Sequence, residues 1–326
     1  MRISRYYLLS VFAVLGVGAL GFILVRSRQM HLTVLNRSTN SVATGASGNL
    51  LSVVYPNTYD DPQPFIQGLY AADHRASLPV HPRIRAVIVP HHLVASASIA
   101  AGIRALRGEH FSRIILLSPD HFHQCRTVLC TVNATYHTFF GDVSASRDVV
   151  AELSSSSLVT IQPDLFKREH GIFAVVPFVA HDFPGVPVTP IAMSQDLPWR
   201  SDETALSHLF DHLINRQTIL IVSSDFSHYL SLPQAQQMDA QTQKTIASRN
   251  VDAIARLQDP AQSDCPGCLW TLASLASQQQ FYHPVVLMHT NSATLLHDST
   301  VPKTTSHFSM IWYEQTPSST AMNTFY

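Results

Sequence analysis

Residues 85–92 read Arg-Ala-Val-Ile-Val-Pro-His-His, a run of apolar and β-branched residues that ends at two histidines. An uninterrupted run of this kind is typical of a strand buried on both faces of a sheet. Apolar residues then recur at helical spacing through residues 94–107. The stretch therefore predicts a strand, a loop and a helix, with His91 and His92 in the loop.

The same alternation continues along the chain. Further buried strands are expected at residues 113–119, 186–193 and 218–223, helices at 202–215, 236–257 and 269–278, and late strands at 284–289 and 308–313. Pro187 and Pro190 favour a position near an edge of the sheet for the strand that contains them, because proline cannot donate to a ladder. The pattern predicts a single-domain α/β sandwich with a largely parallel central sheet.

Composition narrows the function classes. The chain has 326 residues, of which 46% are hydrophobic and 13% charged, and its net charge is −1. A charge so close to zero does not indicate a nucleic-acid binder. The sequence contains no P-loop, HExxH or GxSxG motif, so the common signatures of NTPases, zincins and α/β-hydrolases are missing.

The N-terminus carries a long apolar segment. Residues 6–25 contain no charge and are flanked by arginines on both sides. A run of about 20 residues matches the hydrocarbon core of a bilayer. A cleaved signal peptide is the alternative, but the run exceeds a usual signal core and no small-x-small site precedes Arg26.

These features predict four segments. They are a membrane anchor at residues 1–28, a flexible linker at 29–49, an α/β domain at 50–315 and a disordered tail at 316–326. We expect a single-pass membrane protein, attached through its N-terminal helix, with its body outside the cytoplasm.

Several strand ends carry side chains suited to chemistry. His91 follows the first strand, His121 the second, and Asp225 and His228 the strand at 218–223. The carboxyl ends of strands form the ligand crevice of open α/β sheets, and neutral imidazole is a common metal ligand. Solvated loop histidines and a simple turn are the alternative interpretations. His170, which follows Glu169, either lines the same pocket or belongs to a local cap.

The cysteines allow three interpretations. An even number, Cys125, Cys130, Cys265 and Cys268, permits two disulfides in an exported domain. The Cys265-Pro-Gly-Cys268 turn precedes a helix, where a thiolate is favoured, so it also resembles a thiol–disulfide exchange motif. Alternatively, one or both of the Cys265 and Cys268 sulfurs bind a metal.

Read together, the motifs resemble the Memo family, also called the AmmeMemoRadiSam system protein B family. The matching stretches, within residues 50–315, are Pro90-His91-His92-Leu93-Val94, Ser118-Pro119-Asp120-His121, Glu169-His170-Gly171-Ile172-Phe173, Ser223-Ser224-Asp225-Phe226-Ser227-His228-Tyr229 and Cys265-Pro266-Gly267. The resemblance implies a fold similar to that of class III extradiol dioxygenases, with iron or copper held by two histidines and one cysteine. Carried over, the ligands are His91, His121 and Cys265.

The chain also departs from the family pattern. The usual Ala-Gly-Tyr is replaced by His92-Leu93-Val94, so His92 either joins or replaces His91. The second Glu of the Glu-His motif is Ala174, and the late Cys-Gly has become a CxxC, which makes Cys268 an alternative ligand.

We therefore expect a membrane-anchored metalloprotein that binds one transition metal ion, iron or copper first and zinc next. Its reaction would be redox or dioxygenase-like, on a small molecule or peptide, with His228, Asp225 and His170 as proton-transfer residues. Two alternatives stay open: a non-catalytic module that binds a peptide or protein, and a thiol oxidoreductase that uses the CxxC.

Overall fold

The strand expected at residues 85–90 forms as β2, Ile84–Val89, and every side chain in it is buried. Ala86 and Ile88 contribute to one hydrophobic core, and Val87 and Val89 to a second. The neighbouring strands β3 and β9 divide their side chains between the same two cores. Because both faces are covered, these strands read as continuous apolar runs.

The computed structural model describes residues 50–74 and 83–314. Its strands are β1 (Val53–Tyr55), β2 (Ile84–Val89), β3 (Arg113–Pro119), β4 (Leu129–Thr131), β5 (Ala134–Thr138), β6 (Gly141–Ser144), β7 (Val159–Ile161), β8 (Val188–Met193), β9 (Thr218–Ser223), β10 (Phe226–Leu230), β11 (Val285–Asn291) and β12 (Thr304–Tyr313). Its helices are α1 (Gln63–Asp73), η1 (Leu93–Ala95), α2 (Ser96–Arg104), α3 (Arg147–Ser154), α4 (Pro163–Phe166), α5 (His170–Phe173), α6 (Val176–Asp182), η2 (Trp199–Asp202), α7 (Glu203–Leu213), α8 (Leu232–Ala247), α9 (Val251–Ala255), α10 (Pro266–Gln278) and α11 (Ser292–Leu295).

Within these residues, a mixed sheet has the strand order β10-β12-β2-β9-β3-β8-β4-β7, and β11 pairs with β12. Its centre, β2-β9-β3-β8, is parallel. β12 runs antiparallel to β2, and β4 runs antiparallel to β8. The structure is therefore a single-domain α/β fold with a mixed sheet, in agreement with the class predicted from the sequence.

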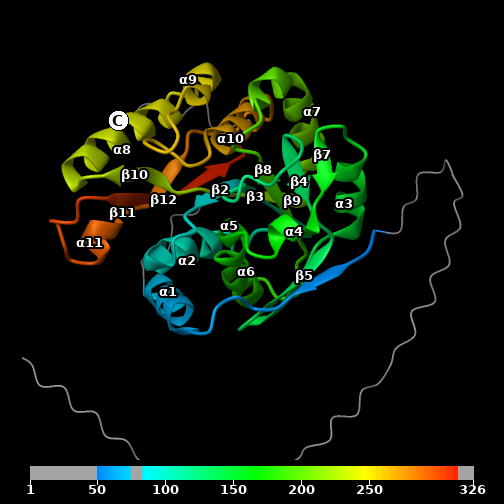
Figure 1. Ribbon diagram of the computed structural model, residues 1–326, viewed down its shortest axis with the longest axis horizontal. Coiled ribbons are helices and arrows are strands. Elements are labelled where there is room, and N and C mark those ends of the chain that lie inside the picture. Colours follow the sequence, from blue (N-terminus) through cyan, green and yellow to red (C-terminus); the bar gives the residue numbers. More distant parts are fainter. Residues whose placement is uncertain (1–49, 75–82, 315–326) are drawn as a thin grey trace, which may run out of the picture. The chain divides into compact units, whose positions relative to one another are not determined.

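Helices cover both faces of this sheet. α7, α8, α9 and α10 lie on one side, and α1, α2, α5 and α6 on the other (Figure 1). The two cores lie between the sheet and these helical layers. A separate small sheet, with the order β1-β5-β6, was not expected from the sequence.

Two predicted details were wrong. β8 is an internal strand between β3 and β4, although its prolines suggested a position near an edge. The short β4 pairs only with Ile191–Met193, so Pro190 lies beyond the end of that ladder. The helix expected at residues 236–257 is also broken into α8 and α9. Arg249 adopts a φ of 56°, and the side chain of Asn250 caps α9 by accepting from the Ala253 N–H.

The predicted membrane localisation requires correction. The apolar segment at residues 6–25 lies outside the described residues. Within residues 50–74 and 83–314, no helix has both the length and the apolar character needed to cross a bilayer. We therefore do not retain the assignment of a single-pass membrane protein with an external body.

Candidate metal centre

The order of the central strands brings distant residues together. β9 lies between β2 and β3, and all three strands run parallel. Their carboxyl ends therefore meet at one edge, where His91 follows β2, His121 follows β3 and Asp225 follows β9. This edge is where open α/β sheets bind their ligands.

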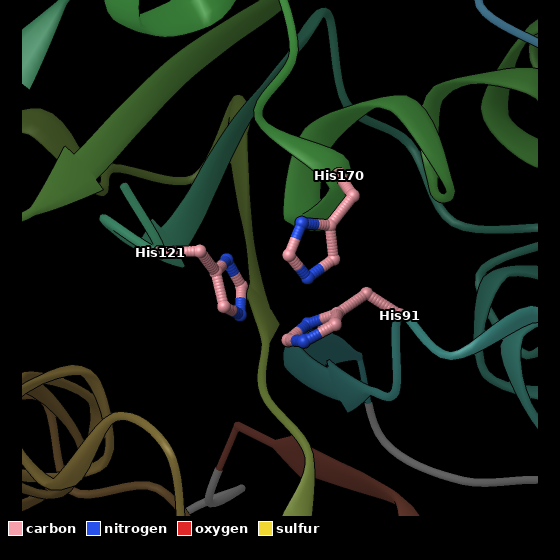
Figure 2. Close-up of side chains that lie close together, drawn as sticks. All are labelled: His91, His121 and His170. Atoms are coloured by element: carbon pink, nitrogen blue, oxygen red, sulfur yellow. The ribbon is translucent and has the colours of Figure 1, made fainter. Parts of the chain in front are cut away.

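Three histidines converge at this edge. One ring nitrogen from each of His91, His121 and His170 lies within 4.8 Å of the others. Figure 2 shows the three rings facing one another, two from the segments after β2 and β3 and His170 from the start of α5. The ring centroids of His91 and His121 are 4.7 Å apart, and those of His121 and His170 are 3.8 Å apart.

Buried partners fix the orientation of two of these rings. Nδ1 of His91 lies 3.0 Å from Ser223 Oγ, whose hydroxyl donates to the Gly171 carbonyl at 2.7 Å. The hydroxyl is therefore the acceptor for His91 Nδ1–H. Nδ1 of His121 lies 2.6 Å from Oε1 of the fully buried Glu169. Both interactions leave Nε2 free, which is how proteins prepare histidines to bind metals.

The two free Nε2 atoms face a carboxylate that the sequence did not single out. Oδ2 of Asp264 is 3.1 Å from His91 Nε2 and 3.7 Å from His121 Nε2. The same carboxylate accepts from Ser224 Oγ at 2.8 Å and from the Asp225 N–H at 3.1 Å. Asp264 is thus held in place between the two imidazoles. Its only sequence signal is its position directly before Cys265.

The carboxylates dominate the electrostatics of this group. Burial lowers the pKa of His91, but the charges of Asp225 and Asp264 outweigh burial and leave that pKa raised. Burial also lowers the pKa of His121, yet hydrogen bonds to Asp264 and Glu169 raise it to about 10. Burial raises the pKa of Asp264, but the two histidines outweigh burial and hold that pKa well below the usual range. The site therefore favours positive charge beside Asp264.

His170 differs electrostatically from the other two histidines. Its partial burial and the charges of His121 and His91 lower the pKa of His170 to about 4. In the described part of the chain no hydrogen bond orients its ring, and the residue is exposed. His170 is therefore neutral at pH 7 and lies on the side of the cluster that faces the cavity.

Asp225 and His228 lie beside this cluster. The Asp225 carboxylate accepts a hydrogen bond from the backbone N–H of His91 at 3.2 Å, and its Oδ2 is 3.6 Å from the ring atom Nε2 of His91. His228 is half-buried, and its Nδ1 has no hydrogen-bond partner among the described residues. Both residues line a cavity of about 730 Å³ that also contains His91, His121 and Asp264.

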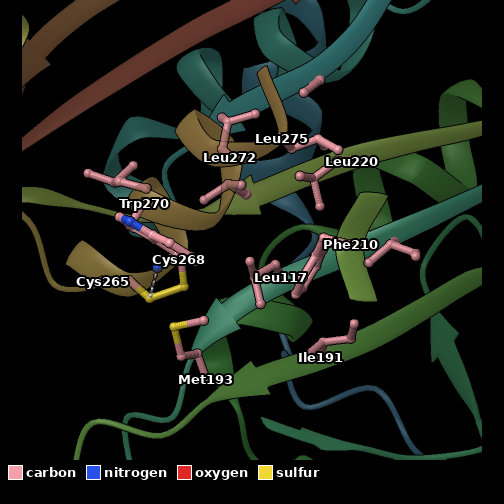
Figure 3. Packing of buried hydrophobic residues seen from close by; sticks show 14 of the residues in the cluster. Leu117, Ile191, Met193, Phe210, Leu220, Cys265, Cys268, Trp270, Leu272 and Leu275 are labelled. Atoms are coloured by element: carbon pink, nitrogen blue, oxygen red, sulfur yellow. Dashed lines mark hydrogen bonds between the residues drawn. A yellow bond between two sulfur atoms is a disulfide. The ribbon is translucent and has the colours of Figure 1, made fainter. Parts of the chain in front are cut away.

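Among the described residues, Cys265 is not part of the donor groups that contain these histidines. Its sulfur is bonded to that of Cys268, and the two residues are 1% and 0% exposed. Figure 3 shows this disulfide at the hydrophobic core near Met193 and Trp270. Cys125 and Cys130 form a second disulfide. A disulfide sulfur is not a thiolate and therefore is not available as a metal ligand. The group that faces the two histidines in this structure is the carboxylate of Asp264.

The fold and this cluster define an α/β protein with a candidate metal centre at the carboxyl edge of its sheet. The chain belongs to the Memo family: the model of that family, described as Memo-like protein, matches residues 53–306. The resemblance seen in the sequence motifs is thereby confirmed.

Individual members of the family share limited sequence identity with this chain. MEMO1 family proteins of Caldivirga maquilingensis and Methanococcus maripaludis are both 28% identical, over 45% and 43% of this chain and 54% and 51% of their own lengths. The chain thus spans about half the length of the curated relatives it matches. A solved structure, an uncharacterized protein JW3007 of Escherichia coli K12, has a TM-score of 0.48 and 12% identity over 70% of this chain and 99% of its own.

Proposed function

We propose that this chain is a non-haem metalloprotein whose ion is held by His91, His121 and Asp264. The observation that carries this proposal is the convergence of both free histidine Nε2 atoms on one oxygen of Asp264, at 3.1 and 3.7 Å. Two histidines and one carboxylate, with open positions beside them, are the ligand set of non-haem iron(II) oxygenases. We therefore assign iron(II) to the site and redox chemistry to the protein.

The donor set fits a divalent cation. Asp264 and Asp225 bring two carboxylates into a largely buried position, and buried charges need a counter-charge. Nitrogen and oxygen donors suit iron(II), while copper(I) prefers soft sulfur ligands that this cluster lacks. Zinc also binds these donors, so metal identity has to be measured.

The chain's own residues have separable roles in this proposal. Ser223 and Glu169 hold the rings of His91 and His121 in the metal-binding orientation. His170, which lines the cavity and whose ring makes no hydrogen bond within the described residues, is placed to contact the substrate. When bound, the ion supplies redox chemistry with O₂.

The cavity favours a small-molecule substrate. A volume of about 730 Å³ lies within the range of pockets that enclose small ligands. Tyr59 and Phe122 add apolar ring surface to a lining that is otherwise rich in histidines and carboxylates. The non-catalytic binding module remains the second candidate, because the same cavity accommodates a ligand without turnover.

The thiol oxidoreductase alternative has no structural support. Redox-active cysteines are partly exposed, because the attacking thiolate has to reach a second sulfur. Cys265 and Cys268 are 1% and 0% exposed and lie in the hydrophobic core.

Iron retention and oxygen uptake test the proposal together. The full chain is purified anaerobically without a His tag, and its iron is measured beside O₂ consumption with a panel of small organic molecules. We expect bound iron and substrate-dependent uptake. His121→Asn should lose the ion of this site and the uptake with it, whereas His137→Gln, at a surface histidine 2.6 Å from Asp142, should keep both. Bound iron without any uptake would favour the binding module, and a chain that takes up no metal would refute the proposal.

A further inference from the structure

A second group of donors lies next to the first. One potential ligand atom from each of His92, Asp225 and His307 lies within 4.8 Å of the others. Nδ1 of His92 is 3.2 Å from Nε2 of His307. Neither of these histidines belongs to the set His91, His121 and Asp264.

The sheet explains how His307 reaches this position. β12 runs antiparallel to β2, with Met310 opposite Ile88. His307, three residues earlier in β12, is therefore level with the segment that follows β2, which carries His92. The register of this ladder therefore sets the position of His307 beside that segment.

The group has the donors of a metal site. His307 is fully buried, and its Nε2 faces Nδ1 of His92. Two imidazoles beside a buried carboxylate form a donor set for a first-row transition ion. His92, which is exposed and lines the cavity, gives an ion access to this site.

Asp225 connects the two groups. It belongs to the set formed with His92 and His307, and also to a set formed with His91 and Asp264. We infer that His92, His307 and Asp225 bind a second divalent transition ion, and that the Asp225 carboxylate bridges this ion to the first. The second site stands on its own residues, whereas the bridge rests on the proposed first site. His92 then adds a site rather than replacing His91.

The inference is tested by counting ions in the metal-stripped full chain titrated with Co²⁺. We expect two ions per chain in the wild type and one in His92→Gln or His307→Gln. His121→Asn should also bind one, and the double variant His121→Asn/His307→Gln none. His137→Gln, which alters a surface histidine–aspartate pair, should keep two. His92 is exposed, so its variant tests the site even where His307→Gln folds poorly.

The outcomes separate the two sites. A wild type that binds one ion, with no loss in His92→Gln, would overturn the second site and leave the first intact. Two ions that both survive His121→Asn would instead refute the first site. For the bridge, the electron spin resonance signal per cobalt should be weaker with two ions than with one, because bridged ions couple magnetically. Equal signals per cobalt would contradict the bridge.

Discussion

Oδ2 of Asp264 lies 3.1 Å from Nε2 of His91, although the two residues are far apart in the sequence. Asp264 lies two residues before α10, and Cys265, the N-cap of that helix, forms a disulfide with Cys268 in its first turn. The neighbouring residues thus have different environments, because the carboxylate faces the histidines and the sulfur packs in the core.

Asp264→Asn should weaken metal binding, whereas Cys265→Ser should leave it unchanged. The first removes the proposed carboxylate ligand and should lower iron affinity by at least tenfold, a change measured by competition with a chelator. The second removes a buried disulfide and should reduce stability by about 2–4 kcal/mol while keeping the iron. Loss of iron in Cys265→Ser alone would favour the cysteine ligand expected from the family resemblance.

Glu169→Gln should weaken metal binding without removing a ligand. Oε1 of Glu169 accepts from His121 Nδ1 at 2.6 Å and thereby fixes the ring. Loss of such an outer partner typically lowers metal affinity about 10–100-fold. Asp142→Asn, which alters the surface pair with His137, is the matched control. Unchanged affinity in Glu169→Gln would show that the ring needs no orientation.

The metal-stripped chain should lose stability as pH rises. Burial lowers the pKa of His121, but hydrogen bonds to Asp264 and Glu169 raise it to about 10 in the folded chain, against about 6.5 unfolded. The folded state therefore holds this proton more tightly, so the contribution is complete below pH 6.5 and is lost towards pH 10. We expect the free energy of unfolding to fall by about 1.4 kcal/mol per pH unit in this window.

Denaturant titrations at several pH values measure this slope. Glu169→Gln should flatten it, because one of the two hydrogen-bonding partners that raise this pKa loses its charge. An identical slope in the variant would count against the assigned network.

Gly171→Ala should disturb the site through packing. A Cβ at Gly171 would lie 2.0 Å from Ser118 Oγ and 3.2 Å from Glu169 Oε1. Overpacking of this kind typically costs about 1–3 kcal/mol. The double variant Gly171→Ala/Ser118→Ala should recover part of the loss in thermal unfolding. No recovery would place the strain elsewhere.

The sequence predicted the central strands because side chains buried on both faces leave a continuous apolar signal. It also placed His91 and His121 at strand ends, since both directly follow such runs. β1, β4 and β7 are only three residues long and owe their existence to partners distant in sequence. Such pairing cannot be predicted from the local sequence pattern, because it depends on residues far away in the chain.

Asp264 and His307 were not predicted as site residues, because long-range packing decides their positions as well. Asp264 sits in an ordinary polar segment, and His307 falls inside a strand whose pattern indicates only a strand. Their meeting with His91 and His92 is set by the docking of α10 and by the register of β12 on β2. The cysteine was the more conspicuous residue, yet the carboxylate one position earlier faces the histidines.

X-ray absorption at the iron edge of the reconstituted full chain tests the central claim most directly, because sulfur scatters differently from nitrogen and oxygen. We predict an inner shell of nitrogen and oxygen atoms alone, with a histidine contribution that decreases in His121→Asn. A sulfur atom in that shell, lost in Cys265→Ser, would contradict the two-histidine, one-carboxylate site.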